Sequence, residues 1–137
     1  MDRKKIKLVR ESFDALTPIA DQVPDLFYDR LFEIDPDTRV LFPEDMTDQK
    51  RKLMLMLATA VYGLRDIYGL LPAVQELGRR HGAYAVSEAQ YDSVGQALLY
   101  ALRAGLGEKF TPDVETAWVE VYTLLATVMK DAQRKVA

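Results

Sequence analysis

Apolar residues recur at intervals of three and four along most of the chain, which is the spacing that places side chains on one face of an α-helix. The stretch over 70–86 is the clearest example, because Leu70, Val74, Leu77 and His81 follow one another at spacings of four, three and four. The sequence has no convincing alternation of apolar and polar residues and no Asn-Gly or Asp-Gly hairpin signal. It therefore predicts an all-α fold, with an imidazole on the inward face of this helix.

Three helices are predicted in the first half of the chain, separated by proline-containing corners. The first ends at Thr17-Pro18, and the second ends at Asp35-Pro36, before a short and partly 3₁₀ segment over 37–42. After a loop, Thr47 or Asp48 is expected to cap a long third helix. The predicted inward side chains are Ile6, Val9, Phe13, Leu16, Leu26, Phe27, Leu31, Phe32, Gln49, Leu53, Met56, Leu57, Ala60 and Leu64.

The third helix is predicted to reach about Ile67, and Gly69 to break it before the helix that carries His81. Ser87, followed three residues later by Gln90, resembles a capping box that opens the next helix. Glycine and proline mark the turn between the last two predicted helices. Gly105 and Gly107 are expected to close this helix near Leu106, and Thr111-Pro112 to cap a last helix with the core residues Trp118, Tyr122, Leu125 and Met129.

Length and composition indicate one domain over residues 1–137, because 137 residues with 49% hydrophobic content can bury a core and no repeat or linker interrupts them. Cysteine is absent, which excludes disulfides and Cys-based metal sites, and a single histidine argues against an all-protein zinc site. The net charge of -3, with both signs interspersed, argues against a nucleic-acid partner.

The N-terminus is too charged for a signal peptide, and no uninterrupted apolar run approaches the ~20 residues that span a bilayer. We therefore expect a cytoplasmic protein without membrane insertion. On its own, a lone histidine on an apolar face is more often a core histidine with satisfied polar atoms than a metal ligand. A set of motifs elsewhere in the chain changes this balance for His81.

These motifs, in their order and spacing over essentially the whole chain, resemble the globins, in particular bacterial single-domain haemoglobins and the haem domain of flavohaemoglobins. They are Leu26-Phe27-Tyr28, Leu31-Phe32, Leu41-Phe42, Gln49 with Leu53, Leu77-Gly78-Arg79-Arg80-His81, Tyr91 and Ala117-Trp118. The resemblance implies a globin fold, with helices packed around one haem b (iron protoporphyrin IX). It also implies that His81 is the proximal ligand of the haem iron.

The resemblance also implies which other side chains line the pocket. The apolar ones are Phe42 against the porphyrin, Leu77 and Val86 on the proximal side, and Leu53 on the distal side; ordinary core packing is the alternative for each. The candidates for pairing with the haem propionates are Arg80, Arg79, Lys50 and Lys52, with solvated surface charge as the alternative.

Tyr28 and Gln49 carry the polar chemistry that the resemblance implies on the distal side. A phenol O–H and an amide N–H can each donate a hydrogen bond to a gas that has drawn electron density from iron, and such a bond contributes about 1.5 to 3 kcal/mol. The alternatives are a buried Tyr28 bonded to backbone and an exposed Gln49. An error of one residue in helix register would turn Gln49 outward.

Two features bear on the proximal side. In flavohaemoglobins a tyrosine and a glutamate hold the proximal histidine and increase its electron donation. Tyr91 matches the tyrosine, whereas the glutamate position, counted without gaps from Trp118, falls on Gln133, so strong peroxidase-like donation is not expected. Because the chain has one histidine, two histidines of the same chain cannot ligate the iron, and a position for gas should stay available.

The expected function is reversible binding of dioxygen, for storage or delivery, with carbon monoxide and nitric oxide as further ligands and a monomer or homodimer as the assembly. The alternatives are a nitric oxide dioxygenase and a gas or redox sensor. The chain stops where a flavin and nicotinamide reductase would begin, so redox turnover would need an external reductase.

Overall fold

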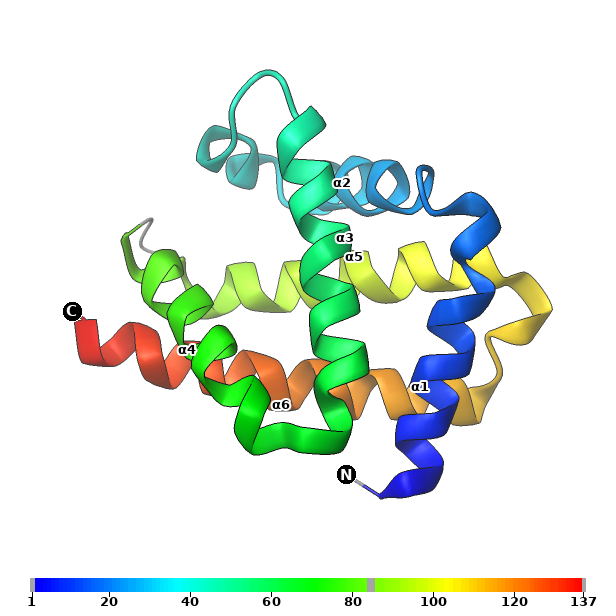
Figure 1. Ribbon diagram of the computed structural model, residues 1–137. Helices are drawn as coiled ribbons and strands as arrows, with labels where there is room; N and C mark the ends of the chain where they lie inside the picture. Colours follow the sequence, from blue (N-terminus) through cyan, green and yellow to red (C-terminus); the bar gives the residue numbers. More distant parts are fainter. Residues whose placement is uncertain (1, 84–85, 137) are drawn as a thin grey trace.

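The computed structural model describes residues 2–83 and 86–136, and these residues form helices and short connections without a β-strand. The α-helices are α1 (Arg3–Ala15), α2 (Val23–Ile34), α3 (Thr47–Gly63), α4 (Ile67–Ala83), α5 (Glu88–Leu106) and α6 (Pro112–Val136) (Figure 1). Single 3₁₀ segments lie at Thr17–Ile19, Pro36–Leu41, Leu64–Asp66 and Gly107–Lys109. The predicted all-α class is confirmed. The end of the predicted 70–86 helix includes residues 84 and 85, which lie outside the described part.

Local side-chain signals begin and end α5 as the sequence predicts. Ser87 Oγ accepts a hydrogen bond from the backbone N–H of Gln90 over 3.2 Å, and Gln90 Oε1 accepts from the backbone N–H of Ser87 over 2.8 Å. These two bonds form the reciprocal capping box. The helix closes at Gly107, whose φ of 57° lies in the left-handed region that favours glycine.

The cap of α3 differs from the prediction. Thr47 is the first residue of the helix, and the N-cap is Met46, which makes no side-chain cap bond; the carboxylate of Asp45, just before it, accepts from both the backbone N–H of Thr47 (3.0 Å) and its hydroxyl (2.7 Å). Neither Thr47 nor Asp48 caps the helix, because the chain is already helical at both positions. These two bonds lower the pKa of Asp45 below its ordinary value.

The predicted boundary between the third and fourth helices is also wrong. α3 ends at Gly63, and Gly69 lies inside α4 instead of breaking the chain. The direction changes at the 3₁₀ turn Leu64–Asp66, where Asp66 Oδ1 accepts from the backbone N–H of Gly69 over 3.1 Å. The signal for this corner was therefore the aspartate that bonds the start of α4, and not the glycine.

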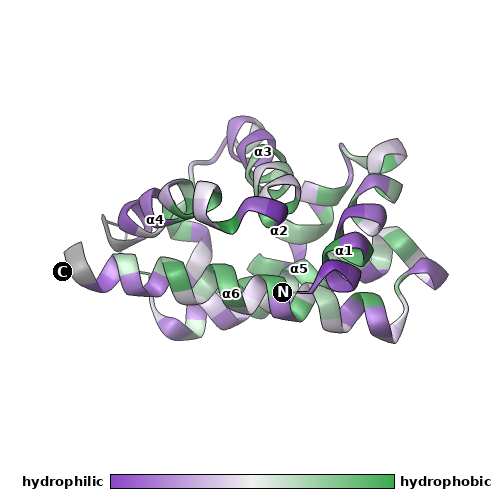
Figure 2. Ribbon diagram, turned by 60° about the horizontal axis from the view of Figure 1, so that its bottom comes forward, coloured by the Kyte–Doolittle hydropathy of each residue, from purple (hydrophilic) through white to green (hydrophobic). Residues whose placement is uncertain are grey.

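The helical run Thr47–His81 passes for a membrane span by length and composition, with a mean hydropathy of 1.3 over its most apolar window. The sequence analysis did not anticipate such a run. In the structure it consists of two 17-residue helices, α3 and α4, and the chain turns back between them (Figure 1). The charged residues of this run lie in the first turns of α3, at Arg65 and Asp66 between the helices, and in the second half of α4, and Figure 2 shows apolar stretches in both helices.

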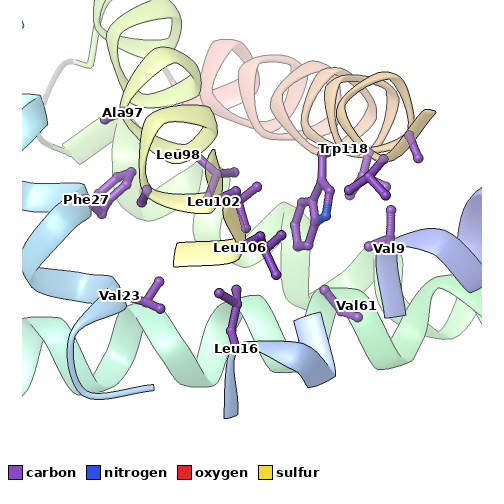
Figure 3. Close-up of a cluster of buried hydrophobic side chains, with 14 of the residues drawn as sticks. Val9, Leu16, Val23, Phe27, Val61, Ala97, Leu98, Leu102, Leu106 and Trp118 are labelled. Carbon is purple, nitrogen blue, oxygen red and sulfur yellow. The ribbon is translucent and has the colours of Figure 1, made fainter. Parts of the chain in front are cut away.

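The core lies where α1, α2, α5 and α6 meet, and Trp118 of α6 is its largest fully buried side chain (Figure 3). The indole Nε1 of Trp118 donates to Ser12 Oγ of α1 over 2.8 Å, and this hydroxyl donates in turn to the carbonyl of Leu8 over 2.7 Å. The polar atoms of this apolar region are thus satisfied.

α4, the helix that carries His81, packs along α6. A Cβ atom on Gly78 would lie 2.5 Å from the carbonyl oxygen of Met129, so only glycine permits this approach. α2 packs against α5, and α3 touches both α2 and α4. α3 therefore joins the helix that carries Tyr28 to the helix that carries His81.

Candidate functional site

Tyr28 and Gln49, the two candidate donors, lie side by side. Tyr28 of α2 is buried, and its Oη accepts a hydrogen bond from Nε2 of Gln49 in α3 over 3.2 Å. Gln49 is half-buried, so its side chain points toward α2 and not outward into solvent. Among the described residues no acceptor faces the O–H proton of Tyr28, which leaves the phenol free to donate.

Aromatic rings surround the Tyr28 side chain. The ring centroids of Phe27, Phe42 and Phe32 lie 4.8, 5.4 and 5.9 Å from that of Tyr28, the first two in edge-on geometry. Burial in this cluster raises the pKa of Tyr28, and the hydrogen bond from Gln49 opposes part of that rise. The phenol therefore keeps its proton well above neutral pH.

His81 lies near the end of α4 and is half-buried. Its Nδ1 is 2.7 Å from the carbonyl oxygen of Leu77, one turn earlier. A carbonyl can only accept, so Nδ1 is the donor of this bond, and in the neutral imidazole Nε2 then carries the lone pair. No described residue hydrogen-bonds Nε2, so this atom is available as a ligand.

A series of contacts through Tyr91 and Gln133 holds the His81 ring in place. The ring of Tyr91 stacks on His81 with a centroid distance of 5.9 Å and an interplanar angle of 23°. Tyr91 Oη donates to Oε1 of Gln133 over 2.8 Å, and Nε2 of Gln133 donates to the carbonyl of Val86 over 2.6 Å. The amide of Gln133 therefore uses both of its ends, one as acceptor and one as donor.

Sequence reasoning named Tyr91 and Gln133 but missed three partners of this network. These are the Val86 carbonyl, the Lys130 ammonium 5.3 Å from the centre of the Tyr91 ring, and the Tyr122 hydroxyl that donates to the carbonyl of Tyr91. A signal for Lys130 was present, because it lies three residues before Gln133 and shares its helix face. The backbone partners could not be predicted, since they depend on how closely α5 and α6 approach.

The remaining apolar candidates, Phe42, Leu53, Leu77 and Val86, are each half-buried. Phe42 and Leu53 pack against the main core, and Phe42 lies on the same side as Tyr28. Val86 also donates its backbone N–H to the carbonyl of His81 over 3.3 Å.

Most of the basic candidates for the propionates already have carboxylate neighbours. Lys50 Nζ lies 2.7 Å from Asp25, Arg79 Nη2 lies 2.9 Å from Glu76, and Arg80 Nε lies 3.7 Å from the same Glu76. The Arg80 side chain is 71% exposed, so this contact leaves it free to reorient. Lys52 is exposed.

The described residues contain no group of three His, Cys, Asp or Glu side chains that could hold a metal ion. A metal bound by His81 must therefore bring most of its ligands with it, as iron does within a porphyrin. The free Nε2 of His81, the half-buried aliphatic side chains and the protonated phenol of Tyr28 are the donor and wall chemistry that a haem requires.

Fold and donor set together define an all-α protein built around a single-histidine site. Residues 25–129 match the globin family model, and the chain belongs to the globin family. A solved bacterial globin from Campylobacter jejuni superimposes with a TM-score of 0.86 at 19% identity, covering 98% of both chains. The predicted resemblance and fold are confirmed, and membership of this family supports haem-based gas binding.

A flavohemoprotein and several neuroglobins are among the proteins similar to this chain in sequence. A flavohemoprotein of Bacillus subtilis is 29% identical over 131 residues, which cover 92% of this chain and 32% of that protein. A neuroglobin of Tetraodon nigroviridis is 30% identical over 145 residues, 94% of this chain and 90% of the relative. A neuroglobin of Chaenocephalus aceratus is 28% identical over 151 residues. The chain thus spans about a third of the flavohemoprotein and nearly all of each neuroglobin.

Proposed function

We propose that residues 1–137 form one globin domain that reversibly binds dioxygen at a haem b held by His81, with Tyr28 as the principal hydrogen-bond donor to the gas. The observation that carries this proposal is a pair of unused groups. The Nε2 lone pair of His81 and the O–H proton of Tyr28 have no hydrogen-bond partner among the described residues. The lone pair can bind iron, and the O–H proton can be donated to a bound gas.

On the proximal side, the protein would fix the orientation of one imidazole. When bound, haem would supply an iron atom that His81 would hold and that could bind a diatomic gas. The Leu77 carbonyl holds the proton on Nδ1 of His81, and the stacked Tyr91 limits rotation of the ring. Leu77 and Val86 are proposed as the proximal wall.

On the distal side, Tyr28 would donate to a gas that acquires negative charge, and Gln49 would hold the phenol in place. The rings of Phe27, Phe32 and Phe42 exclude water from around the phenol, which strengthens a hydrogen bond made there. Carbon monoxide acquires less charge and would gain less from the same donor. Leu53 is proposed as the distal wall, and Arg80 as the residue that pairs with a propionate.

Nitric oxide dioxygenation, with electrons from an external reductase, is the second candidate function. The similarity to the Bacillus subtilis flavohemoprotein favours it. The neutral amide of Gln133 at the end of the proximal network favours simple gas binding, since it cannot add charge behind Tyr91. The two candidates differ in whether nitric oxide is consumed over many turnovers.

Absorption spectra of the purified protein, oxidised, reduced and with carbon monoxide, test the principal proposal. The parent protein should show one haem per chain and a carbon monoxide complex that forms fully. His81→Ala should lose stable haem, or retain haem only with added imidazole. Tyr68→Ala, in the same helix at an 82% exposed position, is the matched control and should keep its haem. Full retention of haem with an unchanged reduced spectrum in His81→Ala would remove His81 as the ligand.

Nitric oxide consumption, followed electrochemically with dioxygen and a flavin reductase present, separates the two candidates. Reversible gas binding predicts one equivalent of nitric oxide consumed per haem, with no further turnover. Sustained consumption at many equivalents per haem would assign the dioxygenase function instead.

A further inference from the structure

Arg39 binds three consecutive backbone carbonyls. It lies in the 3₁₀ segment Pro36–Leu41, and its Nη1 donates to the carbonyls of Phe42 (3.2 Å) and Pro43 (3.0 Å), while Nη2 donates to that of Glu44 (3.2 Å). A guanidinium suits this task, because its planar fork presents several donors in fixed directions.

The three carbonyls depend on this side chain. They belong to the connection between the 3₁₀ segment and α3, where no helix supplies backbone partners. Among the described residues, no other group donates to them. Loss of the guanidinium would leave three acceptors to water and free this connection to move.

The guanidinium is itself fixed against the aromatic cluster around Tyr28. It lies over the ring of Phe32 at 5.2 Å from the centroid, and Phe32 contacts both Tyr28 and Phe42, with centroid distances of 5.9 and 5.8 Å. Arg39 therefore joins the connection to the rings that enclose the phenol.

The connection determines where α3 begins. After Glu44, the Asp45 carboxylate accepts from Thr47, the first residue of α3, and Met46 is buried in the core, so the chain has little freedom to shift before Gln49. Displacement of residues 42–44 would shift the first turn of α3 and lengthen the hydrogen bond from Gln49 to Tyr28.

We propose that Arg39 is a positioning residue for the gas site, which keeps Phe42 against Tyr28 and Gln49 within hydrogen-bond distance of the phenol. This inference rests on the proposed gas binding next to Tyr28. According to this proposal, the half-buried Arg39 fixes the geometry of a pocket that it does not line.

Arg39→Met tests the inference, because methionine keeps an apolar stem over Phe32 and removes all three hydrogen bonds. Arg30→Met is the matched control. Arg30 also lies over an aromatic ring, that of Tyr100 at 4.8 Å, but its side chain donates to Glu33 and not to the backbone of a connection. Each variant is made alone and with Gln49→Leu, and amide hydrogen exchange and dioxygen release are measured on the haem-loaded protein.

Arg39→Met should speed amide exchange in residues 47–53 by about fivefold or more and dioxygen release by about threefold or more, whereas Arg30→Met should change neither. With Gln49 already replaced, Arg39→Met should add less than about a further twofold to the release rate. Unchanged exchange, or an equal effect on release with and without Gln49, overturns the positioning role. Exchange reports on the connection independently of gas, so a failure here is distinguishable from failure of the proposed function.

Discussion

Nε2 of Gln49 and Oη of Tyr28 lie 3.2 Å apart, although 21 positions separate the two residues in the chain. Since the amide is the donor in this pair, the phenol keeps its own proton for another acceptor. This geometry supports the proposal that the two residues differ in role, with Gln49 orienting the phenol and Tyr28 donating the stronger bond to a gas. This division of roles leads to the first prediction.

Tyr28→Phe should weaken dioxygen binding more than Gln49→Leu does. Removing the hydroxyl deletes one hydrogen bond with little change of shape, so dioxygen affinity should fall by about 1.5 to 3 kcal/mol, mainly through faster release. Gln49→Leu should cost about 0.5 to 1.5 kcal/mol, because the phenol remains but is less well oriented. Stopped-flow release rates measure both. Carbon monoxide is the control and should change much less. Dioxygen release within about twofold of the parent in Tyr28→Phe would contradict the role of Tyr28.

Gln133→Glu should destabilise the fold at neutral pH. A carboxylate can still accept from Tyr91, but it cannot donate to the Val86 carbonyl, and its negative charge would face that oxygen. The folded-state pKa of this glutamate would therefore rise above its unfolded value, so the deficit should be absent at acid pH and develop as the pH rises through about 4 to 6. We expect a loss of about 1 to 3 kcal/mol at pH 7 by urea unfolding. A stability equal to that of the parent at pH 7 would show that the Val86 bond contributes nothing.

Gly78→Ala should force α4 away from α6. The new Cβ would meet the backbone of Met129 at 2.5 Å, which no side-chain rotation relieves, so we expect a loss of about 1 to 3 kcal/mol and weaker haem retention. Gly69→Ala in the same helix is the control. Its Cβ would lie 2.6 Å from the Asp66 carboxylate, a flexible group that can swing aside at the expense of its bond to the Gly69 N–H, and alanine offsets that loss because it favours the helix by up to about 1 kcal/mol. In thermal unfolding, the midpoint temperature of Gly69→Ala should equal or exceed that of the parent, and that of Gly78→Ala should be lower. The reverse order would mean that the helices do not approach as closely as described.

Stability should fall at alkaline pH because of buried phenols. Burial raises the pKa values of Tyr122, Tyr28 and Tyr91 above their ordinary value of 10.0. A raised folded-state pKa contributes stability that is complete below pH 10 and is lost as the pH rises toward the folded value. Tyr122→Phe should therefore flatten the decline in unfolding free energy above pH 10. Tyr68→Phe, at an 82% exposed position, should leave the decline unchanged. An identical decline in both variants would exclude Tyr122 as its source.

The helices were predictable from sequence because their signals are local. The Ser87 capping box, Gly107 and Thr111-Pro112 each act within one turn, and the structure has helix ends at all three. Gly69 misled because a glycine can also lie within a helix at modest cost. The turn at Leu64–Asp66 depends on a side chain bonding the next helix, which spacing alone does not reveal.

The site was predictable in its residue types and less so in its contacts. Apolar spacing placed His81 inward. The direction of Gln49 depended on a helix start that the sequence set too late, with the cap at Thr47 or Asp48 and not at Met46. The bonds to the carbonyls of Leu77 and Val86 involve backbone atoms, whose positions follow from packing and not from residue identity. Arg39 escaped notice for the same reason, since all its acceptors are backbone.

The bond between Trp118 and Ser12 joins residues 106 positions apart. During synthesis α1 leaves the ribosome before the other α-helices, and α6 leaves last, so α1 stays without its partner while nearly the whole domain is made. Closing so long a loop is entropically costly and slows the step that completes the core. The contact between α1 and α6 can therefore form only after the last helix has been made, and a chain that lacks α6 would leave the Val9 face of α1 without the packing that buries it.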